Sequence, residues 1–193
     1  MIIDEHKVIF IHIPKNAGTS IETYFANESV RIQPRKHADI HEIKRDFKNS
    51  YNNYKKFTII RNPYDKMVSW YFYLKRNLGE NHNVIEFNDW IIDLFITHKS
   101  VFPFKFWHAN DPVSFLKNQH EWIDDTVVVI KYENLNKEIN SFFNQKIDLP
   151  VTNKSNHEHF LNYYNKESLN IIYDRYKEDF KKYNYKLNTN KNG

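Results

Sequence analysis

The sequence predicts a single α/β domain in which a parallel β-sheet is flanked by helices. Three apolar runs rich in β-branched residues, 8–13, 55–61 and 126–132, are typical of buried strands. Each run is followed by a segment with helical apolar spacing, and this alternation favours a parallel sheet covered on both faces. The 193 residues suffice to bury the core of one domain. We expect this domain to span 1–186, with 187–193 as a frayed tail.

Composition excludes several classes of protein. The net charge of +4 and the pI near 9.0 suit an anionic ligand, but the excess is too small and dispersed to indicate a nucleic-acid partner. The absence of cysteine excludes disulfides, thiolate chemistry and Cys-ligated zinc. No apolar stretch approaches the roughly 20 residues of a membrane span, and Asp4, Glu5 and Lys7 argue against a signal peptide. We therefore expect a soluble, cytoplasmic protein.

The first strand leads directly into a loop and a helix. Residues 8–13 are followed by 14–20, which read Pro-Lys-Asn-Ala-Gly-Thr-Ser, and then by Ile21, Tyr24 and Phe25 at the spacing of an apolar helix face. Such a loop aims the first free N–H groups of the helix outward, where aligned peptide dipoles favour an anion. The order of elements predicts a phosphate-binding loop.

The residue types in this loop fit that role. Gly18 allows close approach of an oxyanion to the backbone, Thr19 and Ser20 add hydroxyl groups, and Lys15 adds a mobile positive charge. We expect the backbone N–H groups of Asn16, Ala17, Gly18, Thr19 and Ser20 to surround the phosphate. The loop is P-loop-like without being a Walker A motif, because its lysine precedes the glycine.

The remaining elements follow in order. Residues 30–33 predict a short strand that Pro34 ends, and Asp39 is a candidate N-cap for the next helix. Further helices are expected over 63–79, 87–97, 133–143 and 166–183. The aromatic-rich region 81–125 has weak periodicity, and we assign it to the acceptor pocket.

The pattern Ile13-Pro14-Lys15-x-x-Gly18-Thr19-Ser20 after a hydrophobic strand resembles the 5′-phosphosulfate loop of sulfotransferases that use 3′-phosphoadenosine 5′-phosphosulfate (PAPS). The resemblance is closest to the carbohydrate branch, which includes heparan-sulfate 2-O-sulfotransferase. Arg61 closes the second strand and Ser69 lies eight positions later, the separation at which an arginine and a serine hold the 3′-phosphate in this family. The resemblance implies the sulfotransferase fold, PAPS as co-substrate and a hydroxyl acceptor, a carbohydrate or another small molecule.

Weaker matches extend the resemblance along the chain. Residues 129–135 resemble the Tyr-Glu-x-Leu segment of the family. Asn153-x-Ser155, Asp179-Phe180 and Tyr185 resemble the C-terminal pattern of the carbohydrate branch. Many members also carry a basic loop near the C-terminus, where this chain has only Lys154.

Transfer to an alcohol needs a base, and an imidazole that titrates near neutrality suits this role. His37, in a loop before a helix, resembles the base histidine of the 2-O-sulfotransferase-like branch, and His41 is the alternative. His12 alternates within a buried strand and is expected to be a core residue. No metal site is expected, because neither the His37 and His41 pair nor the histidines at 157 and 159 have a third ligand at suitable spacing.

The implied reaction is an in-line displacement in which Lys15 neutralises the leaving phosphate and His37 accepts the acceptor's proton. Two alternatives remain open. A P-loop-type kinase would need lysine after the glycine and an acidic residue at a neighbouring strand end, where this chain has Arg61 and Lys131. A non-catalytic nucleotide-binding module would bind adenosine 3′,5′-bisphosphate without turnover.

Overall fold

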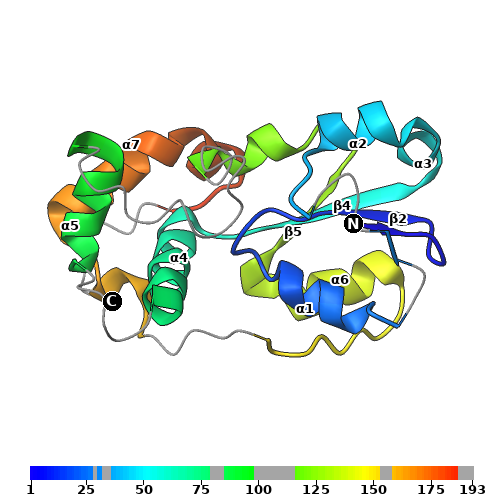
Figure 1. Ribbon diagram of the computed structural model, residues 1–193, viewed down its shortest axis with the longest axis horizontal. Helices are drawn as coiled ribbons and strands as arrows, with labels where there is room; N and C mark the ends of the chain where they lie inside the picture. The colour runs from blue at the N-terminus through cyan, green and yellow to red at the C-terminus, as the bar shows by residue number, and fades with distance from the viewer. Residues whose placement is uncertain (28–29, 32–35, 79–84, 98–115, 153–157, 187–193) are drawn as a thin grey trace. The chain divides into compact units, whose positions relative to one another are not determined.

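The computed structural model describes residues 1–27, 30–31, 36–78, 85–97, 116–152 and 158–186 (Figure 1). The chain divides into two compact units, which we call the sheet unit and the helical unit. The sheet unit consists of Met1–Arg61 and Gln119–Lys154, and the helical unit consists of Asn62–Asn118 and Ser155–Gly193. Each unit therefore combines two stretches that are far apart in the sequence.

A five-stranded β-sheet forms the centre of the sheet unit. Its strands are β1 (Ile2–Ile3), β2 (Val8–Ile11), β3 (Val30–Arg31), β4 (Lys55–Ile60) and β5 (Val128–Lys131). They lie in the order β3-β1-β2-β4-β5. Strands β2, β4 and β5 are the three predicted apolar runs, and they pair in parallel. Strand β1 pairs antiparallel with both β2 and β3, so the sheet is mixed rather than wholly parallel as predicted. The α/β class, a sheet flanked by helices, is confirmed.

The antiparallel pairing follows from a tight turn between β1 and β2. Lys7 has φ 51° in the left-handed region, and its N–H donates to the carbonyl of Asp4 at 3.1 Å. A turn this short can join antiparallel strands, whereas parallel strands need a crossover of a dozen or more residues. Strand β1 has only two residues, too few for a periodicity in the sequence to reveal it.

Helices cover both faces of this sheet (Figure 1). They are α1 (Gly18–Tyr24), α2 (Ile40–Asp46), α3 (Lys48–Asn53) and α6 (Leu135–Phe143), with short 3₁₀ segments at Gln119–Trp122 and Tyr132–Asn134. Successive residues of a strand point to opposite faces. Phe10 accordingly packs with Ile21 of α1 and Ile139 of α6, whereas Ile11 packs with Ile43 of α2 and with Trp122. The β2 strand is thus buried on both sides.

The helix after the short strand begins at the predicted residue. The carboxylate of Asp39 accepts hydrogen bonds from the backbone N–H groups of His41 and Glu42, each at 3.0 Å. The side chain of Glu42 in turn accepts from the N–H of Asp39 at 3.1 Å. These reciprocal bonds form a capping box, and they confirm Asp39 as the N-cap.

The helical unit contains α4 (Pro63–Leu78), α5 (Phe87–Ile92) continued by a π-helical stretch (Asp93–Thr97), a 3₁₀ turn (Phe160–Asn162) and α7 (Lys166–Lys182). These elements agree with the predicted helices over 63–79, 87–97 and 166–183. Large aromatic side chains, among them Tyr64, Trp90 and Tyr164, fill its core. The predicted tail over 187–193, Asn153, Ser155 and much of the region 81–125 lie outside the described residues.

Candidate active site

The loop between β2 and α1 has an unusual backbone. Lys15 has φ 69° and Ala17 has φ 60°, so two residues with side chains adopt the left-handed region that normally favours glycine. The carbonyl of Ala17 accepts from the N–H groups of Ser20 and Ile21, at 3.0 and 3.3 Å, and closes the first turn of α1. Non-glycine residues keep such a conformation only where the surroundings enforce it, and they cluster at functional sites.

Asn16 supplies that enforcement. Its side chain is fully buried, and its Nδ2 donates to the carbonyl of Ile59 on β4 and to Oε1 of Gln119, both at 2.7 Å. Gln119 also pairs twice with the backbone of Arg61, accepting from its N–H and donating to its carbonyl at 2.9 Å each. The side chains of Asn16 and Gln119 thereby tie the loop to the end of β4.

The sequence predicted only a backbone role for Asn16, and it did not reveal Gln119. Gln119 lies 103 residues after Asn16, in a region without periodicity, so no local signal distinguishes it from a surface glutamine. The structure shows that both amides are completely buried and serve the loop's conformation. The hydrogen bonds of these buried amides fix their neighbours strongly, because losing one partner would leave a desolvated polar group.

Gly18 lies against the side chain of His12. A Cβ added at Gly18 would lie 1.8 Å from Nε2 of His12, far inside any real contact distance. The ring therefore occupies the space that any larger residue at position 18 would need. This contact gives a reason for glycine that is independent of close approach by a ligand.

The two loop hydroxyls differ in their surroundings. Ser20 is buried, and its hydroxyl oxygen lies 3.0 Å from that of Thr152, which follows α6. Thr19 is half-buried beside it. The Ser20 hydroxyl thus joins α1 to the chain after α6, a contact that the sequence did not predict.

Arg61 lies beside the loop, as its place at the end of a parallel strand predicted. Its Nη1 donates to the carbonyl of Lys15 at 3.1 Å, and its guanidinium lies 4.2 Å from the centre of the Tyr132 ring. The structure therefore brings two basic residues, Lys15 and Arg61, together at one edge of the sheet. Stacking on an aromatic face also orients the planar guanidinium.

The proposed partner of Arg61 lies in the other unit. Ser69 is buried on α4 of the helical unit, whereas Arg61 belongs to the sheet unit. Lys154, Asn153 and Ser155 lie outside the described residues. The pairing of Arg61 with Ser69 accordingly stays a prediction.

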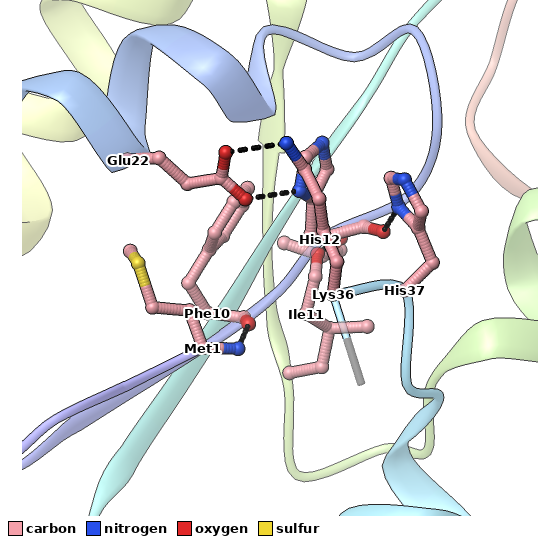
Figure 2. Close-up of polar contacts among 8 residues, drawn as sticks. Met1, Phe10, Ile11, His12, Glu22, Lys36 and His37 are labelled. Carbon is pink, nitrogen blue, oxygen red and sulfur yellow. Dashed lines mark hydrogen bonds and ion pairs between the residues drawn. The ribbon is translucent and has the colours of Figure 1, made fainter. Parts of the chain in front are cut away.

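His37 lies next to His12 (Figure 2). Its Nδ1 is 2.9 Å from the carbonyl oxygen of His12, and the centres of the two rings are 4.3 Å apart. A carbonyl only accepts, so Nδ1 of His37 carries the hydrogen and Nε2 carries the lone pair of the neutral ring. His41 is exposed on the first turn of α2. Of the two candidate bases, His37 is the one held close to the loop's own residues.

His12 itself is buried, as the sequence predicted, but it is not a purely packed residue. Its Nδ1 lies 2.9 Å from Oε1 of Glu22, and Oε2 of Glu22 lies 2.7 Å from Nζ of Lys36 (Figure 2). Burial lowers the pKa of His12 and outweighs the opposing influence of Glu22. The ring is therefore neutral near pH 7, with Nδ1–H donating to Glu22.

Glu22 is the anionic member of this group. Burial acts to raise the pKa of Glu22, but its bonds and charge interactions with His12 and Lys36 outweigh burial and lower the pKa to about 2. Neither Glu22 nor Lys36 was predicted from the sequence as a site residue. Glu22 occupies an ordinary helix position, and neither partner is a neighbour at i+3 or i+4, so helical spacing alone gives no signal.

The described residues contain no group of three or more His, Cys, Asp or Glu side chains arranged to hold a metal ion. No helix within the described ranges has the length and apolar character needed to cross a membrane. The donor groups gathered at the loop, Lys15, Arg61 and the backbone N–H groups, suit an anionic ligand.

Comparison with known protein families gives a match. A family model described as "Sulfotransferase family" matches residues 1–100, which include β1 to β4, the Lys15 loop, Arg61 and α4. Neither the curated proteins nor the solved structures yielded a match to the chain.

Proposed function

The chain belongs to the sulfotransferase family, and from this premise we propose that it transfers a sulfuryl group from PAPS to a hydroxyl group of a carbohydrate. The observation that carries the proposal is the pairing of the Lys15 loop with Arg61 at the carboxyl ends of β2 and β4. In parallel sheets these ends are where ligands bind. The negatively charged phosphate groups of PAPS are complementary to the cationic side chains of Lys15 and Arg61 and to the backbone N–H groups of the loop.

In the proposed reaction, PAPS supplies an activated sulfuryl group. The loop N–H groups from Asn16 to Thr19 and the hydroxyl of Ser20 hold the 5′-phosphate, because the N–H of Ser20 donates to the carbonyl of Ala17. Arg61 with Ser69 holds the 3′-phosphate. Lys15 faces the bridging oxygen and neutralises the charge that develops on the leaving phosphate. These residues provide orientation and a preorganised field, so the chemistry needs no metal ion from the protein.

His37 is the proposed general base. Its Nε2 accepts the proton of the acceptor hydroxyl as the oxygen attacks sulfur, while the bond from sulfur to the phosphate oxygen breaks. The products are a sulfate ester, adenosine 3′,5′-bisphosphate and a protonated His37, which then returns the proton to solvent. The hydrogen bond from Nδ1 to the carbonyl of His12 supports this assignment, because it selects the tautomer with Nε2 as acceptor.

The test is incubation with PAPS labelled with ³⁵S and a panel of glycans, phenols and small alcohols. We expect label to enter a glycan. Label in a phenol alone would keep the sulfotransferase and overturn the acceptor class. Tight binding of adenosine 3′,5′-bisphosphate with no label transferred to any acceptor would favour the non-catalytic module, and phosphoryl transfer from ATP would favour the kinase.

The base is tested by two matched substitutions. His37→Ala should lower turnover by about 10²–10⁴, the usual loss when a general base is removed, while leaving bisphosphate affinity unchanged. His41→Ala removes an exposed histidine nearby and should leave turnover unchanged. The reverse result would move the base to His41, and full activity in both variants would direct attention to a carboxylate such as the exposed Glu133.

A further inference from the structure

The carboxylate of Glu22 is shared between two residues that flank the proposed base. One oxygen accepts from Nδ1 of His12 at 2.9 Å, and the other lies 2.7 Å from Nζ of Lys36. His12 supplies the carbonyl that orients His37, and Lys36 is the residue immediately before His37. Figure 2 shows the four side chains lying together at the end of β2.

These contacts hold the segment around His37 at two points. The ion pair with Glu22 fixes Lys36 to helix α1, and the hydrogen bond from Nδ1 fixes His37 to the carbonyl of His12. The His12 ring is held by Glu22 and by its packing against Gly18. One carboxylate therefore links the loop glycine to the proposed base through side chains that it contacts directly.

Charge around this group is balanced. Glu22 is ionised, Lys36 is cationic and His12 is neutral near pH 7. The amino group of Met1, which precedes β1, interacts electrostatically with Glu22, but burial lowers the pKa of this amino group to about 5, and it donates to the carbonyl of Phe10 at 2.8 Å. The uncompensated charge beside His37 from these described groups is thus close to zero.

We propose that Glu22 is a positioning residue for His37, which it orients through Lys36 and His12 while its charge balances that of Lys36. This inference rests on the proposed function, because it assigns a role relative to the reaction's base. Glu22 and Lys36 are assigned no contact with the donor or the acceptor. Their effect is on the orientation and on the protonation equilibrium of His37.

The charge balance predicts opposite effects for two single substitutions. Glu22→Gln leaves the cation of Lys36 uncompensated beside His37, which disfavours the imidazolium form. Lys36→Gln leaves the anion of Glu22 uncompensated, which favours it. The inflection of the pH–rate profile should therefore move to lower pH in the first variant and to higher pH in the second, each by about 0.5–1 unit at low ionic strength.

The test measures kcat and kcat/KM against pH for wild type, the two single variants and the Glu22→Gln/Lys36→Gln double variant. In the double variant the charges balance again, so its inflection should return to the wild-type pH. Its kcat should remain lowered, because the anchor is missing. Lys48→Gln, which removes an exposed lysine at the start of α3, is the matched control and should change neither quantity.

Two outcomes would overturn the inference while leaving the proposed function standing. One is an active wild type whose inflection is the same in all variants. The other is a shift in the same direction in both single variants, which would indicate a general structural loss. Lys36 is 39% exposed, so Lys36→Gln should fold even if Glu22→Gln does not, and it tests the charge effect alone.

A wild type that transfers no sulfuryl group would contradict the proposed function itself. The positioning role is then read from ¹⁵N-labelled histidine by NMR, which reports the tautomer and titration of each ring. We expect the Nδ1–H tautomer for His37 and the same opposite shifts in its titration. An Nε2–H tautomer for His37 would refute the positioning role whatever the activity.

Discussion

Replacing Gly18 with alanine should destabilise the protein sharply, because the space for a Cβ is filled by the His12 ring. The added carbon would lie 1.8 Å from Nε2 and 2.0 Å from Cδ2 of that ring. The ring cannot turn away easily, since it is buried and its Nδ1 is held by Glu22. Overpacking of a closed site costs about 1–3 kcal/mol. We expect the upper end, about 3 kcal/mol of the free energy of unfolding.

That cost corresponds to a fall in Tm of about 6–12 °C, at about 2–4 °C per kcal/mol for a chain of this size. Removing the His12 ring first should abolish this destabilisation. In a His12→Ala background, Gly18→Ala should be neutral or stabilising by about 0.5–1 kcal/mol, because Gly18 opens α1 and alanine is the better helix former.

Wild type, Gly18→Ala, His12→Ala and the protein with both substitutions form a double-mutant cycle. Their free energies of unfolding are measured by urea unfolding followed by circular dichroism. The expected coupling energy is about 3 kcal/mol or slightly more. Equal costs of Gly18→Ala in the two backgrounds would show that the ring is not the obstacle, and would refute the reasoning from the His12 contact.

Three further predictions concern the nucleotide and the helical unit. Adenosine 3′,5′-bisphosphate should raise Tm far more than AMP does, because at 100 times its Kd it adds about 2.7 kcal/mol to the free energy of unfolding. Arg61→Ala should erase this preference, and equal Tm shifts in wild type would contradict the 3′-phosphate role. Lys15→Ala should abolish turnover while only weakening bisphosphate binding, because its charge matters most in the transition state; near-normal kcat at saturating PAPS would rule this out. Burial lowers the pKa of Lys66 to about 8, so the unfolded chain binds more protons than the folded chain between about pH 8 and 10. The free energy of unfolding should therefore rise between about pH 8 and 10 by an amount on the order of 2 kcal/mol. Urea titrations at successive pH values should detect this rise in wild type and not in Lys66→Met.

Short sequence patterns predicted the site residues that lie close in the sequence to the elements that position them. The run ending at Ile13, the glycine at 18 and the arginine closing β4 each lie within a few residues of the element that positions them. Strand–loop–helix order and Asp39 as a cap follow from propensity and spacing alone. The family resemblance of these segments agrees with the family model that matches residues 1–100.

Contacts between distant residues could not be predicted in this way. Gln119 reaches Asn16 across 103 positions, and Lys36 reaches Glu22 from the far side of the short strand β3. Glutamine and glutamate side chains are usually exposed, so the residue type alone favours a surface position for both. Only the folded chain shows that Gln119 is completely buried and that the carboxylate of Glu22 contacts both His12 and Lys36. The antiparallel strand β1 was not predicted, because a strand of two residues is too short to show an alternation of apolar and polar residues.

The hydrogen bonds of Gln119 to Asn16 and Arg61 also set an order of events during synthesis. Ribosomes release the N-terminus first, so the Lys15 loop and β4 leave the exit tunnel well before Gln119 has been translated. Until then the amide of Asn16 and the backbone of Arg61 lack the partner that joins them. A nascent chain ending before Gln119 carries every residue of the loop, yet the strained conformation at Lys15 and Ala17 lacks the hydrogen bonds through which Gln119 joins Asn16 to Arg61. The loop is therefore completed late, when the second stretch of the sheet unit arrives.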